Sequence, residues 1–328
     1  MERRSFNTGL LALMAGAALA YAGPLLASAA KLPSVVTFVV PFAAGGGADQ
    51  LAREFAHSAQ AQTPGVTFVV ENKPGANGAI AARHVARQPA DGATFLLGTS
   101  STHALGPLIA KVDPHKLVEE FDPVSLLATT ANVLAVSHDS KWETLQDFIL
   151  DARTRPLTYG TFGTGSSAHL YGVLLAQATG AQLEHVPYKG SSQAVTDLMG
   201  GHINAAFLTS SALEGVAREG KVRLLGVTGE TRTKVFPDAK TFAEQQVPQL
   251  DFSGWFALFA PAGTPAELRN AVANVAAGLG RDAGFTKRMT GQGYDWVGSQ
   301  PSALQEALQD TLKVYQKVLS TKPDGLGS

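Results

Sequence analysis

The feature that most constrains this chain is a regular alternation of two kinds of segment from residue 35 onward. Short runs of β-branched or apolar residues are followed by amphipathic segments of helical length. This alternation is typical of α/β proteins with helices packed on largely parallel sheets. The predicted strands are 35–40, 67–71, 94–98, 133–137, 158–161, 183–187, 204–208, 223–228 and 255–260. The predicted helices are 49–62, 79–87, 144–155, 168–179, 192–199, 265–279 and 302–319.

Two long apolar runs, 126–137 and 255–261, suit strands that cross between domains. No linker rich in proline, glycine or charge divides the chain, so we expect the domains to be joined by these crossings. One lobe would comprise residues 31–130 plus 252–328, and the other residues 131–251. A cleft between two such lobes is a common ligand site, because two rigid walls can close on a solute.

Residues 1–30 have the pattern of a secretory signal peptide. Arg3 and Arg4 precede a charge-free stretch with an apolar run at 10–22 and small residues at 27–29. This is the order of a charged region, a hydrophobic region and a cleavage site. The run is shorter than the roughly 20 apolar residues that span a bilayer. We therefore expect an exported protein cleaved near residues 29–31, which uses the general or the twin-arginine route.

Composition excludes several functions. The 328 residues carry 26 Lys and Arg against 27 Asp and Glu, a net charge of −1, which gives no electrostatic basis for binding nucleic acid. The absence of cysteine excludes disulfides, thiolate metal sites and a cysteine nucleophile. There is no H-E-x-x-H metal motif and no G-x-S-x-G nucleophile elbow. We expect no enzyme, no metal site and no cofactor.

The loop at residues 41–49 follows one predicted strand and precedes a predicted helix. Its three consecutive glycines, residues 45–47, leave backbone N–H groups uncovered, and the helix adds the positive end of its dipole. An anion, most simply a carboxylate, fits such a loop. The alternative is a tight turn capped by Asp49, which would not require three glycines. The candidate ligand-binding residues here are Phe42, Ala43, Gly45, Gly46 and Asp49.

A second loop, residues 161–169, is rich in hydroxyl groups. Thr164, Ser166 and Ser167 can donate hydrogen bonds to a small oxyanion. His169 is either a further donor or simply a residue of the first helical turn.

The same loop also fits a dinucleotide-binding pattern. Gly163, Gly165 and Ala168 match G-x-G-x-x-A, and Glu184 follows at about 20 residues. The competing prediction is therefore a nucleotide-dependent oxidoreductase. Export argues against it, because the cofactor would have to leave the cytoplasm with the protein.

Two more polar loops follow predicted strands. Thr99, Ser100 and Ser101 can bind a carboxylate through hydroxyl and N–H groups, although a plain capped turn has the same composition. In the loop at 186–192, Lys189 is either a cation facing the cleft or an ordinary solvated lysine. The sequence leaves open whether His103, Tyr188 and Lys189 touch a ligand.

Several short motifs together resemble a known family. They occur at residues 40–49, 70–76, 91–92, 166–169, 185–190, 254–255 and 260–265. Their order over nearly all of the mature chain is similar to that of the periplasmic solute receptors of tripartite tricarboxylate transporters, also called Bug receptors.

The resemblance implies a type II periplasmic binding protein, with two lobes that close like a Venus flytrap on a small carboxylate. The first glycine loop would hold one carboxylate through backbone amides and ordered waters, and the loops at 99–101 and 164–167 would form the other walls. The receptor, expected to be a monomer, would pass its solute to membrane permease subunits driven by an ion gradient. A signalling scaffold remains a third alternative, because liganded receptors of this kind can also contact sensors.

Two positions depart from the family pattern. Leu208 stands where many relatives have an aspartate suited to a ligand ammonium, so we expect an apolar contact there and no amino acid ligand. Ala44 stands where proline is frequent, which leaves room for close backbone approach. With Phe42 and Phe162 near the site, the expected solute is an aliphatic or aromatic mono- or dicarboxylate.

Overall fold

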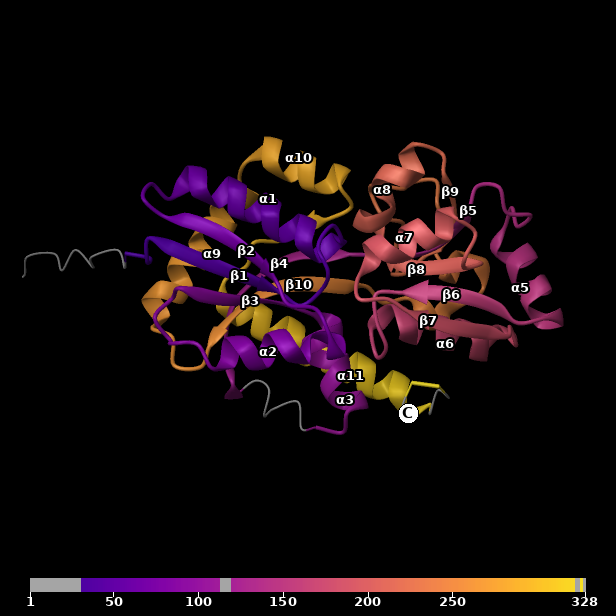
Figure 1. The fold of residues 1–328 in the computed structure, drawn as a ribbon, viewed down its shortest axis with the longest axis horizontal. Coiled ribbons are helices and arrows are strands. Elements are labelled where there is room, and N and C mark those ends of the chain that lie inside the picture. The colour runs from indigo at the N-terminus through magenta and orange to yellow at the C-terminus, as the bar shows by residue number, and fades with distance from the viewer. Residues whose placement is uncertain (1–30, 113–118, 322–324, 327–328) are drawn as a thin grey trace, which may run out of the picture. The chain divides into compact units, whose positions relative to one another are not determined.

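The computed structural model describes residues 31–112, 119–321 and 325–326. Residues 31–328 form one compact unit built on two β-sheets with helices on their faces (Figure 1). The predicted signal peptide, residues 1–30, lies outside the described residues. Among the described helices, none is both long and apolar enough to cross a membrane.

The first sheet has the strand order β11-β4-β10-β3-β1-β2. Its strands are β1 (Val35–Val40), β2 (Thr67–Asn72), β3 (Thr94–Thr99), β4 (Phe121–Thr130), β10 (Gly254–Pro261) and β11 (Asp295–Trp296). The helices that accompany it are α1 (Gly47–Gln62), α2 (Ala79–Ala86), α3 (Gly106–Ile109), α9 (Ala266–Gly280), α10 (Ala283–Gly291) and α11 (Pro301–Ser320). Two short turns, η1 (Ala76–Gly78) and the π-helical η2 (Ser101–Leu105), complete this half.

The second sheet has the strand order β7-β6-β8-β5-β9. Its strands are β5 (Asn132–Ser137), β6 (Leu157–Thr161), β7 (Leu183–Pro187), β8 (Ala205–Thr209) and β9 (Val222–Val227). The helices around it are α5 (Leu145–Thr154), α6 (Ser167–Thr179), α7 (Ser191–Met199) and α8 (Ser210–Arg218). The turns η3 (Ala243–Gln245) and η4 (Pro248–Leu250) lie between β9 and β10.

Every predicted strand and helix is present, with ends within two residues of the predicted ones. The prediction of largely parallel sheets is wrong. β1 pairs in parallel with β2 and β3, and β6 with β7 and β8, but every pair made by β4, β5 or β10 is antiparallel. The reason is that β4 and β5 carry the chain out of the first sheet while β10 brings it back, so these strands run against their neighbours.

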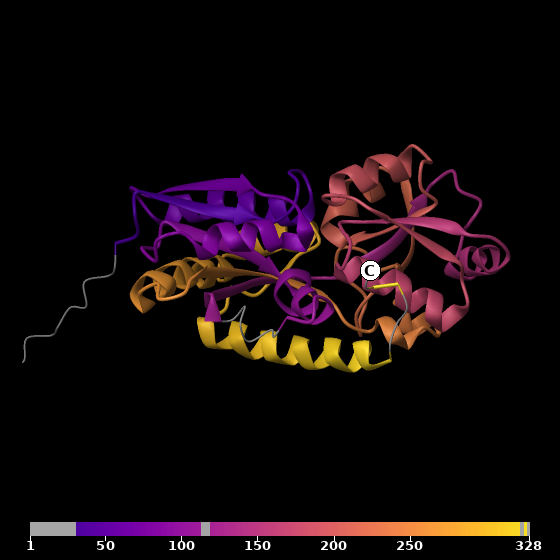
Figure 2. The same ribbon diagram turned by 60° about the horizontal axis from the view of Figure 1, so that its bottom comes forward.

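The chain passes from the first sheet to the second within one residue. β4 ends at Thr130 and β5 begins at Asn132. The return is made by the segment just before β10, where Phe252 lies between two tyrosines. The Tyr171 hydroxyl of α6 donates to the Phe252 carbonyl at 2.7 Å, and the Tyr315 ring of α11 meets the Phe252 ring edge-on at 5.7 Å. Figure 2 shows α11 as the long yellow helix that reaches this region.

The apolar residues of the alternating pattern form the core. In the first sheet Phe38 packs against Phe55 of α1 and Phe95 of β3, with ring centroids 5.3 and 6.2 Å apart. In the second sheet Phe207 of β8 contacts the Tyr171 ring at 6.1 Å. These side chains are almost completely removed from water. Their burial supplies the main driving force that fixes the strand ends where loops meet.

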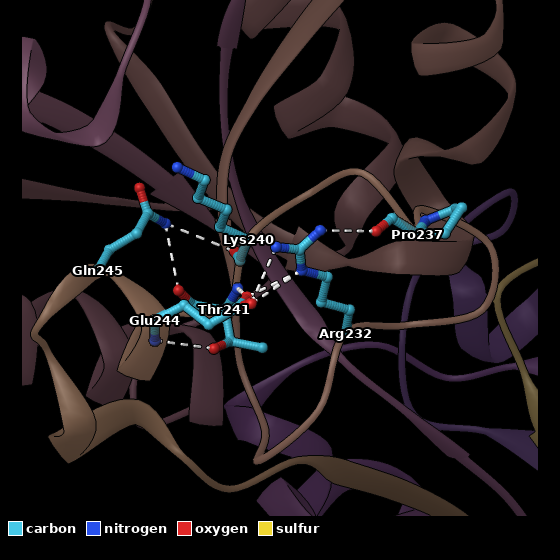
Figure 3. A network of polar contacts seen from close by, with 6 residues as sticks. All are labelled: Arg232, Pro237, Lys240, Thr241, Glu244 and Gln245. Carbon is cyan, nitrogen blue, oxygen red and sulfur yellow. Dashed lines mark hydrogen bonds and ion pairs between the residues drawn. The ribbon is translucent and has the colours of Figure 1, made fainter.

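A polar network holds the segment between β9 and β10 (Figure 3). The Arg232 guanidinium donates from Nε and a terminal nitrogen to the Glu244 carboxylate at 2.9 Å. The Thr241 N–H donates to the same carboxylate at 2.7 Å, while the Glu244 N–H donates to the Thr241 hydroxyl at 3.0 Å. Gln245 donates to the carbonyls of Lys240 and Thr241. This network folds the connection back onto β9 before it returns to the first sheet.

The network predicts a pH-dependent contribution to stability. The hydrogen bonds from Arg232 and then Thr241 lower the pKa of Glu244 to about 2, from an ordinary value of 4.5. The stabilisation is therefore complete above pH 4.5 and is lost as the pH falls through about 2. We expect the Glu244→Gln variant to melt at a lower temperature than the wild type at pH 7, and the difference to shrink between pH 4.5 and 2.

Thermal melts followed by circular dichroism at stepped pH values check this expectation. Glu306→Gln, at an exposed position on α11, is the matched control and should leave the melting temperature nearly unchanged. A Glu244→Gln deficit that stays constant down to pH 2 would contradict the account.

Candidate functional site

A cavity lies where the loops of the two sheets meet. Its empty volume is about 440 Å³, including space open to solvent. The lining residues are Phe42, Gly46, Gly47, Ala48, Thr99, Ser100, Ser101, Thr130, Asn132, Phe162, Ser167, Ser191, Thr209, Gly254, Trp255 and Phe256. Most of them belong to strand ends or to the first turns of helices, the usual place for ligands in α/β proteins.

Four helices begin at this cavity. The lining includes Gly47 and Ala48 of α1, Ser167 of α6, Ser191 of α7 and Thr209, the residue before α8. The first N–H groups of a helix have no partner within the helix, and the helix dipole places partial positive charge at that end. The cavity is therefore suited to an anion.

The N-termini of α1 and α7 are the most open of the four. Their N-cap residues, Gly46 and Gly190, provide no side-chain cap, whereas Ser166 and Thr209 cap α6 and α8. A Cβ atom on Gly46 would lie 3.4 Å from the Ser191 nitrogen, so the two uncapped N-termini face each other. A single carboxylate at this point could accept hydrogen bonds from both helices.

None of the lining residues is charged. The histidines that follow the lining loops add no charge either. Burial lowers the pKa of His103 to about 3 and that of His169 to about 4, so both are neutral at pH 7. His169 stacks on His185 at 3.7 Å, and burial, with a smaller effect of His169, lowers the His185 pKa to about 3. Backbone amides, hydroxyls and helix dipoles are thus the groups that can attract an anion here.

Aromatic rings form the apolar walls. Phe42, after β1, meets Phe162, after β6, edge-on with centroids 5.7 Å apart. Trp255 and Phe256 of β10 add two more rings to the lining. The cavity therefore combines polar helix ends with walls suited to a hydrocarbon skeleton.

Loops from the two sheets are hydrogen-bonded to each other around the cavity. The contacts are Ala43 N–H to Lys189 carbonyl at 3.0 Å, Ser192 hydroxyl to Ala44 carbonyl at 3.1 Å, Ser101 hydroxyl to Ser167 hydroxyl at 3.0 Å, and Asn77 side-chain amide to Gly165 carbonyl at 2.8 Å. These contacts hold the loops of the two sheets together beside the cavity.

Asp49 holds the first glycine loop in shape. Its carboxylate, 3% exposed, accepts hydrogen bonds from the Gly45 N–H at 2.9 Å, Arg53 Nε at 3.0 Å and Asn72 Nδ2 at 3.0 Å. Asn72 Nδ2 also donates to the Phe42 carbonyl at 3.1 Å. Burial by itself would raise the pKa of Asp49, but the hydrogen bonds from Arg53, Gly45 and Asn72 outweigh it and lower the pKa. The loop is thus tied at both ends to one ionised carboxylate.

A family model described as the tripartite tricarboxylate transporter family receptor matches residues 51–322. The chain belongs to this receptor family. Members are periplasmic solute-binding receptors and not enzymes, and the resemblance read from the sequence is confirmed. The predicted fold class, a periplasmic binding protein with two lobes and a central cleft, is confirmed as well.

Three relatives illustrate the match. Protein BugT of Bordetella pertussis is 36% identical over 232 residues, which cover 70% of this chain and 71% of BugT. The structure of R. palustris Rpa4515 with adipate superposes with a TM-score of 0.84 at 33% identity, covering 88% of this chain and 97% of that one. MatC from Rhodopseudomonas palustris with bound malate gives a TM-score of 0.80 at 27% identity, covering 87% and 98%.

Six of the predicted ligand-binding residues of this receptor line the cavity. They are Phe42, Gly46, Thr99, Ser100, Ser101 and Ser167. Three other predicted residues, Ala43, Gly45 and Asp49, shape the first loop from outside the lining, through the bonds described above.

The remaining predicted residues lie elsewhere. Ser166 caps α6, and Thr164 lines a separate pocket beside Asn77. The His169 ring accepts a hydrogen bond from the Gly165 N–H at 3.2 Å. Leu208 is completely buried in the core of the second sheet, because β8 continues one residue further and Thr209 reaches the cavity instead.

The sequence left open whether His103, Tyr188 and Lys189 touch a ligand, and all three lie outside the cavity lining. His103 is buried and stacks on Phe259 with centroids 4.1 Å apart. The Tyr188 hydroxyl donates to Asp197 at 2.6 Å, and the Lys189 side chain is exposed.

The oxidoreductase alternative receives no support. Gly163 and Gly165 do not line the cavity, and Glu184 is exposed on β7, the edge strand of the second sheet. The loop instead serves the receptor as a helix cap, because the Ser166 hydroxyl accepts from the His169 N–H at 3.2 Å and donates to the Gly163 carbonyl at 2.7 Å.

Sequence reasoning missed several lining residues of the receptor. Ser191 lies in the loop at 186–192, whose two adjacent serines were a usable signal. Thr130, Asn132 and Gly254 lie where the chain crosses between the sheets. Gly254 belongs to the motif at 254–255, and Thr130 and Asn132 lie in the predicted crossing run 126–137, but nothing in the local sequence marks any of the three as a lining residue.

Asp49→Ala should destabilise the receptor by about 1–3 kcal/mol, because it removes the buried carboxylate that accepts hydrogen bonds from Gly45, Arg53 and Asn72. Urea denaturation at pH 7 measures the change. The exposed Asp139→Ala is the control and should stay within about 0.5 kcal/mol of the wild type. A loss for Asp49→Ala no larger than that of the control would contradict the role assigned to this carboxylate.

Proposed function

We propose that this receptor captures a small organic carboxylate between its two sheets and delivers it to the membrane subunits of a tripartite tricarboxylate-type permease. The single observation that carries the proposal is the pair of uncapped helix N-termini, α1 and α7, facing each other in an uncharged cavity. Anions are stabilised at such ends by free N–H groups and the helix dipole. One carboxylate of the ligand binds there.

The ligand is an aliphatic or aromatic mono- or dicarboxylate. Relatives with adipate and with malate support a carboxylate, and the aromatic rings of the lining suit a hydrocarbon skeleton. The lining contains no carboxylate side chain to pair with an ammonium group. Burying an unpaired ammonium is costly, which disfavours amino acids.

The two lobes of the proposal are residues 31–130 plus 252–328 and residues 131–251. Each lobe contributes one of the uncapped helices, so only a bound anion engages both sets of donors at once. Binding then shifts the population toward the closed form. The receptor works as a monomer, and the ligand-binding residues Phe42, Gly46, Thr99, Ser100, Ser101 and Ser167 surround the solute.

We further propose that the protein acts in the periplasm. The sequence pattern of residues 1–30 and the periplasmic location of family members support export. The permease that takes the solute is driven by an ion gradient.

A thermal-shift screen of the purified protein tests the proposal. The panel contains adipate, malate, succinate, benzoate, the acidic amino acids and nicotinamide nucleotides. A ligand that binds only the native state raises the melting temperature, and we expect a rise with one class of carboxylates. A rise with nucleotides alone, or with none of the carboxylates, would overturn the proposal.

Gly46→Val should weaken carboxylate binding by about tenfold or more while the protein stays folded. The extended backbone at Gly46, φ −83° and ψ 171°, accepts a valine. Its side chain would stand in front of the Ser191 N–H and keep the anion from both helix ends.

The binding is measured by isothermal titration calorimetry, with Gly291→Val as the matched control. A Cβ atom at Gly291 meets no atom within 4 Å, so this variant should keep wild-type affinity. Full affinity in Gly46→Val would count against the α1 and α7 ends as the carboxylate site.

A further inference from the structure

Asn132 is a buried residue of the cavity lining whose amide oxygen has no hydrogen-bond partner among the described residues. Its side chain is 1% exposed and belongs to the lining. Within the described residues, its Oδ1 atom accepts no hydrogen bond. A buried polar atom is normally paired, so an unpaired one at a binding site points to a partner on the ligand.

The backbone holds Asn132 in this place. Its N–H donates to the Thr228 hydroxyl at 2.9 Å, and its carbonyl accepts from the Thr228 N–H at 2.8 Å. It is also the first residue of β5 and pairs with Thr209 of β8. The backbone of Asn132 is therefore fixed at the end of β5, a strand in the interior of the second sheet, beside the cavity.

The space beside this amide is kept open by a glycine. A Cβ atom on Gly254 would lie 3.7 Å from Asn132 Nδ2 and 3.3 Å from the Ser100 hydroxyl oxygen. Ser100 also lines the cavity. An amide and a hydroxyl thus flank the bare backbone of Gly254 at the point where the two sheets join.

We infer that the solute carries a hydroxyl group that hydrogen-bonds to Asn132, so that the ligand is a hydroxycarboxylate. This inference rests on the proposed carboxylate-binding function and adds the second polar group that the receptor reads. A hydroxyl can both donate and accept, so it suits either orientation of the amide. It also adds no charge to a cavity lined without any charged side chain.

An ammonium group could donate to Oδ1 as well, but the lining offers no acidic partner to offset its buried charge. A solute without a donor would leave Oδ1 desolvated and unpaired, a loss that corresponds to about tenfold in affinity. Asn132 therefore favours a ligand group that donates a hydrogen bond and carries no charge.

Matched ligands test this on the wild-type protein. Calorimetric titration compares malate, succinate and aspartate as one set, and mandelate, phenylacetate and phenylglycine as another. We expect the hydroxylated member to bind about tenfold tighter than the member without hydroxyl in at least one set, with the amino member weakest.

The outcomes separate the two proposals. If no carboxylate binds, the proposed function fails. If carboxylates bind but the hydroxyl makes no difference in either set, or the amino member binds tightest, the function stands and the inference about Asn132 is wrong.

A variant assigns the preference to the residue. In Asn132→Leu, the hydroxylated ligand and its counterpart without the hydroxyl should bind with about equal affinity, mainly because the hydroxylated ligand binds more weakly than to the wild type. Asn204→Leu is the matched control, because Asn204 Oδ1 accepts hydrogen bonds from Thr158 outside the cavity. The control should keep the wild-type preference for the hydroxylated ligand even if it lowers stability. If Asn132→Leu keeps the wild-type preference for the hydroxylated ligand, the inference is wrong. If this variant does not fold, the comparison of matched ligands on the wild-type protein decides the inference.

Discussion

The convergence of helix N-termini on a cavity without charged side chains is the constraint on which this receptor depends. Partial charges at helix ends are fixed in direction and need no counter-ion of their own. They can stabilise a buried anion without the desolvation cost of a buried lysine or arginine. The same property makes the site adaptable, because backbone amides bind a carboxylate whatever skeleton carries it. Specificity must then come from the walls and from isolated polar groups such as Asn132.

The rest of the fold keeps these helix ends in place. The Asp49 carboxylate ties the glycine loop to α1 and β2, so the amides of this loop are oriented before any ligand arrives. The strand crossing at Thr130 and Asn132, and the return at Phe252, connect the two sheets. Hydrogen bonds between loops of the two sheets, among them the buried pair Ser101 and Ser167 in the cavity lining, hold the helix ends of both sheets at one place.

The strands and helices could be predicted well because each is marked in its own stretch of sequence. The marks are the spacing of apolar residues, the residue types typical of helix ends, and the glycine-rich loops between elements. Sequence reasoning also located the first glycine loop and the hydroxyl loops, whose residues at Gly46, Ser100 and Ser167 line the cavity. It could not foresee the antiparallel central strands or the contributions of Asn132 and Gly254, since both follow from where the chain crosses between sheets. Leu208 shows how much one residue matters at a strand end, because Leu208 lies in the core of the second sheet while its neighbour Thr209 lines the cavity.

The central claim is that a negative charge is held by helix ends and hydroxyls. The most direct measurement is a calorimetric comparison of the tightest carboxylate found with its carboxamide, which has nearly the same size and shape but no charge. The account predicts that the carboxylate binds at least about tenfold tighter, because charge-assisted hydrogen bonds are stronger than neutral ones. Equal affinity for the carboxamide would contradict it and would assign the binding energy to the aromatic walls instead.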